Sequence, residues 1–183
     1  AVASFDKAIK IKPEFVDVWN SKGDALQKLE RYDDAIAYYD KVIEIDQKNA
    51  SVWRSKGDAL QKLERYDDAI ACYDKAIEID PKKATAWNSK GVELADLDRY
   101  EEAIVCYDKT IEIDPKDFRA WFNKGLALFD LERYEEAVTC NDKAVEIDPK
   151  YAKAWRWKGQ ALKKLERHEE AITCFDKAVE IDP

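Results

Sequence analysis

The residue types that most often carry catalysis are few in this chain, and those present recur at one fixed spacing. The single histidine, His168, stands where other copies of the same stretch have a tyrosine. Carboxylate pairs such as Asp33–Asp34 and Glu101–Glu102 occur in each copy, where they suit the first turn of a helix through its dipole. No Gly-rich phosphate loop, HExxH or GxSxG motif is present. We therefore expect no catalytic residues and no enzymatic activity.

The four cysteines show the same regularity. Cys72, Cys106, Cys140 and Cys174 are each 34 residues apart (106 − 72 = 34). Equivalent positions on stacked helices lie roughly 8–10 Å apart, which exceeds the Cα separation of about 7 Å that a disulfide tolerates. Zinc ligands usually occur in pairs about two to four residues apart, which this column lacks. We interpret the cysteines as semi-buried thiols of a reducing compartment, which predicts a cytoplasmic location without metal or cofactor.

Tryptophan, glycine and proline define the unit behind this spacing. Trp19 is followed by a tryptophan every 34 residues (53 − 19 = 34), and all five glycines repeat with the same period from Gly23. The five prolines share one further position of the unit, where Gln47 fills the single gap. A fixed period of roughly 20 to 50 residues is typical of a stacked repeat protein.

Each unit predicts two amphipathic helices. Trp19, Gly23 and Leu26 fall on one helical stripe, and a second stripe runs through Tyr39 and Val42. Asp-Pro then ends the unit, because proline disfavours helix at the preceding residue and cannot donate the next hydrogen bond. Glycine within a helix costs about 1 kcal/mol relative to alanine, so its recurrence indicates close approach of two helices.

These residues resemble the tetratricopeptide repeat (TPR) family. The family pattern W…KG…L, then Y…A…Y…A/V…DP, is carried in the first unit by Trp19, Gly23, Leu26, Tyr32, Ala35, Tyr39 and Val42. The resemblance covers full repeats at 16–49, 50–83, 84–117, 118–151 and 152–183, with a lone second helix at 1–15. It implies one all-α domain over 1–183, a TPR α-solenoid of antiparallel helix pairs forming part of a right-handed superhelix.

One departure from the family pattern is the lysine before each glycine, as at Lys22, where the family usually has leucine. The aliphatic stem of a lysine covers apolar surface while its charge reaches water, so we expect the fold to be retained.

Charge and hydropathy exclude two classes of partner. The formal net charge is −8, whereas phosphate neutralisation needs an excess of lysine and arginine. No apolar run approaches the ~18 residues of a membrane span, and no signal peptide is visible. We expect neither a nucleic-acid nor a membrane partner.

Function is expected in the positions that differ between units. On the first helix, the columns of Asn20, Asp24 and Gln27 lie beside the tryptophan stripe and change from unit to unit. In the TPR family this face lines the concave groove that binds peptides, so the resemblance implies a protein–protein interaction scaffold. The predicted groove residues are Asn88, Val92, Ala95, Phe122, Leu126, Phe129, Lys153, Arg156, Gln160 and Lys163.

The fourth and fifth units give this face its chemistry. Phe122, Leu126 and Phe129 are expected to face solvent and to hold apolar side chains of a ligand. Arg156 and Lys163 would meet an acidic side chain or a C-terminal carboxylate. The alternative is that the two phenylalanines pack against the adjacent unit and that the basic residues form a solvated face.

A second function, from a different class, is a self-assembling or engineered structural array whose partner is another copy of itself. The stretches at 21–37 and 55–71 are identical, which favours this hypothesis. The chain starts in the middle of a unit and shows no polar capping helix after its last one. Both ends are therefore expected to expose apolar surface, through which copies of the chain would associate.

Overall fold

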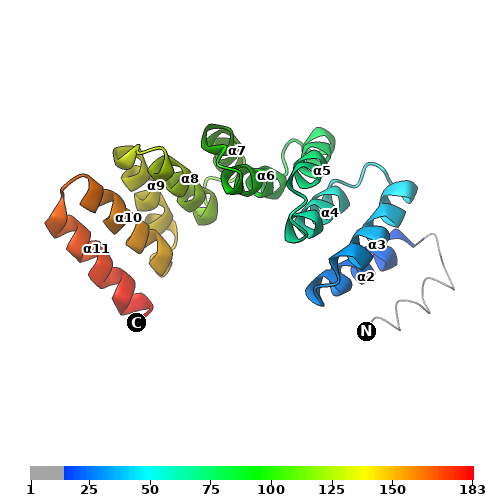
Figure 1. Cartoon of the computed structure of the whole chain (residues 1–183), viewed down its shortest axis with the longest axis horizontal. Coiled ribbons are helices and arrows are strands. Elements are labelled where there is room, and N and C mark those ends of the chain that lie inside the picture. The colour runs from blue at the N-terminus through cyan, green and yellow to red at the C-terminus, as the bar shows by residue number, and fades with distance from the viewer. Residues whose placement is uncertain (1–14) are drawn as a thin grey trace. The chain divides into compact units, whose positions relative to one another are not determined.

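The structure, a computed structural model, describes residues 15–183, which form α-helices joined by short turns (Figure 1). No strand occurs within this range, so the all-α prediction is confirmed. The half repeat predicted at 1–15 lies almost wholly outside the described residues. The helices are α2 (Val16–Lys28), α3 (Tyr32–Ile45), α4 (Ala50–Lys62), α5 (Tyr66–Ile79), α6 (Ala84–Asp96), α7 (Tyr100–Ile113), α8 (Phe118–Asp130), α9 (Tyr134–Ile147), α10 (Ala152–Lys164) and α11 (His168–Ile181).

The chain divides into two compact units, Ala1–Glu93 and Leu94–Pro183, and the boundary falls within α6. In the first unit α2 packs on α3, α3 on α4, and α4 on α5. In the second unit the same order links α7 to α8, α8 to α9, α9 to α10, and α10 to α11. Successive helices therefore pack in pairs that stack, as in an α-solenoid. A single continuous domain and its superhelical course stay predictions.

The first and the second helix of each pair end in different turns, and each turn recurs along the chain. The first helix of each pair ends before a leucine, and the next residue adopts a left-handed backbone conformation, as at Glu30 with φ 59°. The second helix ends at an aspartate whose side chain accepts a hydrogen bond from the backbone N–H two residues later. At Asp46 this bond, to the Lys48 nitrogen, is 3.1 Å long although Gln47 replaces the usual proline. The aspartate turn therefore ends the helix with or without proline.

The glycine column marks where the two helices of a pair approach most closely. A Cβ on Gly23 would lie 2.5 Å from the Tyr39 ring, and one on Gly57 would lie 2.6 Å from the Tyr73 ring. Both tyrosines are fully buried. The predicted close approach is confirmed, because a side chain at either glycine would overlap the ring below it.

The lysine before each glycine joins neighbouring pairs. Lys56 Nζ lies 2.6 Å from Asp40 Oδ1, so that α4 is tied to α3. The equivalent pairs at later junctions are Lys90–Asp74, Lys124–Asp108 and Lys158–Asp142. The lysine side chains are only about one-fifth exposed, which explains how the fold accepts lysine where the family has leucine.

The tryptophan column anchors the turn between pairs. The Trp53 indole N–H donates to the Gln47 carbonyl at 3.1 Å, and the Trp155 N–H donates to the Pro149 carbonyl at 3.0 Å. Each tryptophan thus fills space with its ring and satisfies a turn carbonyl with its N–H.

Candidate functional site

The predicted groove residues fall in both units. Asn88 and Val92 belong to the first unit, and the other eight belong to the second. A groove that runs through both units therefore stays a prediction. Within the second unit, the residues of α8 and α10 lie on helices that contact each other.

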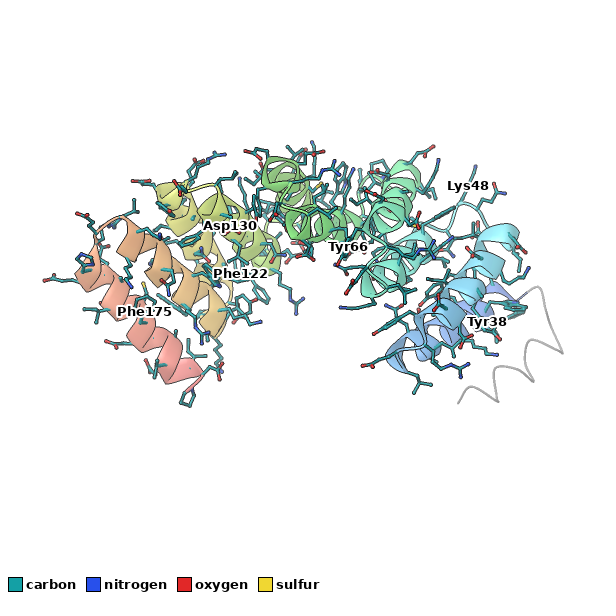
Figure 2. The ribbon with its side chains drawn as sticks, viewed as in Figure 1. Tyr38, Lys48, Tyr66, Phe122, Asp130 and Phe175 are labelled. Carbon is teal, nitrogen blue, oxygen red and sulfur yellow. The ribbon has the colours of Figure 1, made fainter. Side chains whose placement is uncertain are left out.

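Phe122 does not face solvent, so this expectation was wrong. The residue is 6% exposed and belongs to a buried cluster with Val145 of α9 and Ala154 of α10. Its ring meets the edge of the Tyr151 ring, with centroids 5.0 Å apart and planes at 88°. Figure 2 labels it on α8, with Asp130 at the C-terminal end of the same helix. Phe122 is buried because Tyr151, at the start of α10, places a second ring against it.

In two other repeats, the residue at the position of Tyr151 caps the helix. Asn49 accepts a hydrogen bond from the Val52 N–H at the start of α4, and Asp117 accepts two at the start of α8. Tyr151 makes no such cap, and it packs instead against Phe122 and Phe118. Where those two repeats have a helix cap, worth about 1 kcal/mol, this repeat has aromatic packing.

Phe129 and Trp157 form an aromatic pair across α8 and α10. Their ring centroids lie 5.1 Å apart at 76°, and the Phe129 ring also meets Tyr134 of α9 at 5.2 Å. Phe129 and Trp157 are both half-buried, so they keep exposed surface. Leu126 is half-buried as well and packs against the neighbouring cluster. Phe129 therefore packs against the adjacent repeat and remains partly exposed. Leu126 adds apolar surface on α8.

The exposed face of α10 is basic. Lys153, Arg156 and Lys163 are exposed, and none of them forms an ion pair within the described part of the chain. Gln160 lies between them and is half-buried. We call the combined set the α8–α10 surface; it comprises Leu126, Phe129, Lys153, Arg156, Trp157, Gln160 and Lys163.

The same columns have a different chemistry in the compact unit Ala1–Glu93. Arg54, the equivalent of Arg156, forms an ion pair with Asp58 on the same helix. Asp58 also accepts hydrogen bonds from the Tyr73 hydroxyl at 3.1 Å and the Ser89 hydroxyl at 3.4 Å. Burial raises the pKa of the Asp58 carboxyl, and Arg54 is the main opposing influence. The positive charge of Arg54 is therefore already paired with an acid of the same helix.

A hollow of about 420 Å³ lies between α2 and α4 on this polar face. It is lined by Asp24, Gln27, Lys28, Tyr32, Arg54, Ser55, Asp58 and Lys62. The Tyr39 hydroxyl oxygen lies 2.8 Å from Asp24 Oδ1 and 2.8 Å from Gln27 Oε1, and its single proton serves these two acceptors. The lining carries two acids and three bases, and Arg54 and Asp58 already pair with each other, so the hollow has no strong charge preference for a ligand.

The larger hollows belong to the scaffold. One of about 700 Å³ lies beside Trp53, Lys75 and Ile79, and another of about 580 Å³ lies beside Trp155, Lys177 and Ile181. These lining residues occupy the same columns of the repeat in the two units. We therefore attribute these hollows to the repeat itself.

Two residues on α9 and α10, Asn141 and Trp157, were missed in the sequence. Trp157 stands in a column that otherwise has serine or asparagine, as at Ser55, and Asn141 stands where other units have tyrosine or phenylalanine. Asn141 is fully buried under Gly125, and its Oδ1 has no hydrogen-bond partner among the described residues. Comparison of these columns between units would have found both residues, because each departs from the repeat at the same junction.

The described residues show no sign of a metal or membrane site. They contain no group of three or more His, Cys, Asp or Glu residues arranged to hold a metal ion. None of their helices has both the length and the apolar character needed to cross a bilayer. His168 is exposed at the start of α11.

The stacked helix pairs define the class of the molecule as an α-solenoid repeat protein. A family model described as tetratricopeptide repeat matches residues 16–49, 50–83, 84–117, 118–151 and 152–183. The chain belongs to the tetratricopeptide repeat family, as its sequence resemblance implied.

Solved structures with the same fold include MamA and YrrB. A crystal structure of MamA has a TM-score of 0.82 at 24% identity, covering 87% of this chain and 94% of that one. MamA from Desulfovibrio magneticus RS-1 gives a TM-score of 0.83 at 23% identity, covering 91% and 94%. YrrB, described as a TPR protein with an unusual peptide-binding site, gives a TM-score of 0.79 at 26% identity, covering 100% and 94%. No curated protein sequence matches the chain. The family and these structures support a protein-interaction scaffold.

Proposed function

We propose that the chain binds a peptide segment of another protein on the α8–α10 surface. The ligand places an apolar side chain against Leu126, Phe129 and Trp157, and acidic groups against the basic residues of α10. The observation that carries this proposal is that Lys153, Arg156 and Lys163 are exposed without an ion pair beside a half-exposed aromatic pair. Exposed aromatic residues next to arginine are typical of the centre of a protein interface.

The peptide-binding site of the related structure YrrB supports the class of ligand. The repeat supports the location, because the aromatic residues at this junction are additions to a frame that holds elsewhere without them. In the compact unit Ala1–Glu93, the columns of Phe129 and Trp157 are occupied by Gln27 and Ser55. Stacking alone therefore does not require the Phe129–Trp157 pair.

A charge-reversal variant tests the proposal. The triple change K153E/R156E/K163E removes the basic face of α10 and leaves the aromatic pair intact. The matched control is K48E/K82E/K116E, because these three lysines are exposed in turns and form no ion pair in the described chain. Both variants change the net charge by −6, so long-range charge effects are the same.

Binding is measured by fluorescence polarisation against a labelled library of acidic peptides with one apolar residue, after circular dichroism shows equal helix content. We expect at least a roughly tenfold loss of affinity in the α10 variant, equivalent to about 1.4 kcal/mol, and little change in the control. Equal binding by both variants, or no binding by the natural sequence, would overturn the proposal.

Self-association is the second candidate function, and one observation favours it. Ile172 and Val179 on α11 are 59% and 63% exposed, whereas their equivalents on α9, Val138 and Val145, are each 7% exposed. Sedimentation velocity at rising concentration tests this function with the variant I172K/V179K. The control is V105K, which alters a valine on α7 that is 59% exposed. Oligomers that disappear only in the α11 variant would support self-association, and a monomer at all concentrations would exclude it.

A further inference from the structure

Resting on this proposed function, we infer that the ligand is an internal segment in which acidic residues flank the apolar residue on both sides. The alternative is a ligand that ends in one carboxylate. The positions of the three unpaired basic residues relative to Trp157 distinguish these two chemistries.

The basic residues extend along the whole of α10. Lys153 is its second residue and Lys163 its second-last, so with a rise of about 1.5 Å per residue they lie about 15 Å apart along the helix axis. One carboxylate can bridge two neighbouring donors, but it cannot span this distance. Satisfying both ends of the stripe needs at least two acidic groups.

Trp157 lies between the two ends of the stripe. It follows Lys153 by one helical turn and precedes Lys163 by six residues, which are about 6 Å and about 9 Å along the axis. Along the helix axis, the Trp157 position therefore has a basic residue on either side, and at about 100° per residue Lys153 is turned about 40° and Lys163 about 120° from it around the helix. An apolar side chain on this pair has a basic partner site in either direction.

The charges on α10 are not neutralised within the fold. Arg156 has Gln160 four residues later, where Arg54 has Asp58, so the ion pair of the first unit is absent. Lys153 lies in the first turn, where the helix dipole favours an acid. The α10 sequence contains no Asp or Glu at all. Ligand carboxylates can therefore supply the missing partners through charge-assisted hydrogen bonds.

These distances give the ligand an approximate spacing. An extended peptide advances about 3.3 Å per residue, so about 6 Å and 9 Å correspond to two and three residues. Because Lys163 is also turned around the helix from Trp157, three residues is the minimum on that side, and the segment has the order acid, one residue, apolar, at least two residues, acid. Its direction along α10 is set by which flanking acid meets Lys153.

Three amide-capped synthetic peptides of equal composition test this order. The first has the flanking arrangement around a leucine, the second has both acids on one side, and the third has both acids replaced by glutamine with two distant acids outside the segment. A fourth peptide carries one internal acid and a free C-terminal carboxylate. We expect the flanking peptide to bind at least about tenfold more tightly than each of the others.

The variants K153E and K163E then assign each acid. Replacing one flanking acid by lysine is expected to restore binding to one variant, and replacing the other acid to restore it to the second variant. If both variants respond to the same acid, or if the one-sided or free-carboxylate peptide binds most tightly, the flanking arrangement is wrong while the proposed function stands. If none of the four peptides binds and no member of the acidic library binds, the proposed function fails as well.

Discussion

The Lys158 ammonium lies 2.5 Å from the Asp142 carboxylate, so that one ion pair ties α10 to α9. The lysine is 19% exposed and the aspartate 49% exposed. The same pair recurs at the other junctions within each unit. This position thus joins successive repeats by a charge contact where the family usually has an apolar one.

A double-mutant cycle on Lys158 and Asp142 measures this contact. We expect a coupling free energy of about 0.5–1 kcal/mol, at the upper end for exposed pairs because the lysine is largely covered. Urea unfolding of K158A, D142A and the double variant gives the value, and it should fall at high salt. The control cycle on Lys177 and Glu180, which are both at least half exposed, should give a smaller coupling. Equal coupling in the two cycles would contradict the role assigned to Lys158.

Phe122→Ala is expected to lower the free energy of unfolding by about 3 kcal/mol, because it leaves a cavity among Tyr151, Val145 and Ala154. Val105→Ala is the matched control, since Val105 is 59% exposed on α7. It should change stability by less than about 0.5 kcal/mol. Chemical denaturation of both variants checks the difference. A Phe122 variant as stable as the control would show that its ring is not part of the core.

Gly57→Ala is expected to destabilise the chain, although alanine favours helix by about 1 kcal/mol. The new Cβ would lie 2.6 Å from the rigid Tyr73 ring, and such overpacking costs about 1–3 kcal/mol. Gly125→Ala should cost less, because its nearest neighbour is the terminal nitrogen of Asn141 rather than a ring. Urea unfolding of the two variants compares them directly. Equal losses would indicate that Asn141 is held as firmly as a tyrosine.

The buried cysteines are expected to react slowly with alkylating reagents. Burial raises the pKa of the Cys72 thiol, and likewise that of Cys140, to about 11. A raised pKa means that the folded state favours the neutral thiol, so this stabilisation is complete below about pH 9 and is lost as the pH rises through 11. Iodoacetamide labelling at pH 8, followed by mass spectrometry, should be at least about a hundredfold slower than in urea. Rapid labelling of the folded chain would show that the thiols are accessible.

The repeat allowed the fold to be predicted from the sequence, because each column has one physical task in every unit. The glycine column predicted close packing, and Gly23 indeed lies against Tyr39. The orientation of Phe122 could not be predicted in the same way. Its burial depends on Tyr151, whose column holds Phe15, Asn49, Lys83 and Asp117 in the other repeats and therefore has no common physical task.

The basic half of the candidate site was easier to recognise than the aromatic half. Lys153, Arg156 and Lys163 could be placed on an exposed face because helical spacing alone determines which side they share. The contact of Phe129 with Trp157 joins two helices, and helical spacing within one helix says nothing about such a pair. The proposed role of Arg156 also rests on its lack of an ion pair. This lack becomes apparent only by comparison with Arg54, which pairs with an acid on its own helix.

The tryptophan residues of the repeat differ in how their intrinsic fluorescence should respond to a ligand. Trp53, Trp87, Trp121 and Trp155 each donate to a backbone carbonyl at 3.0–3.1 Å, so these four indoles share one hydrogen-bond arrangement. Trp157 stands outside this column, beside Phe129. We therefore expect an occupant of the α8–α10 surface to change the emission of Trp157, and of Trp121 and Trp155, which pack against the same cluster, more than that of Trp53 and Trp87.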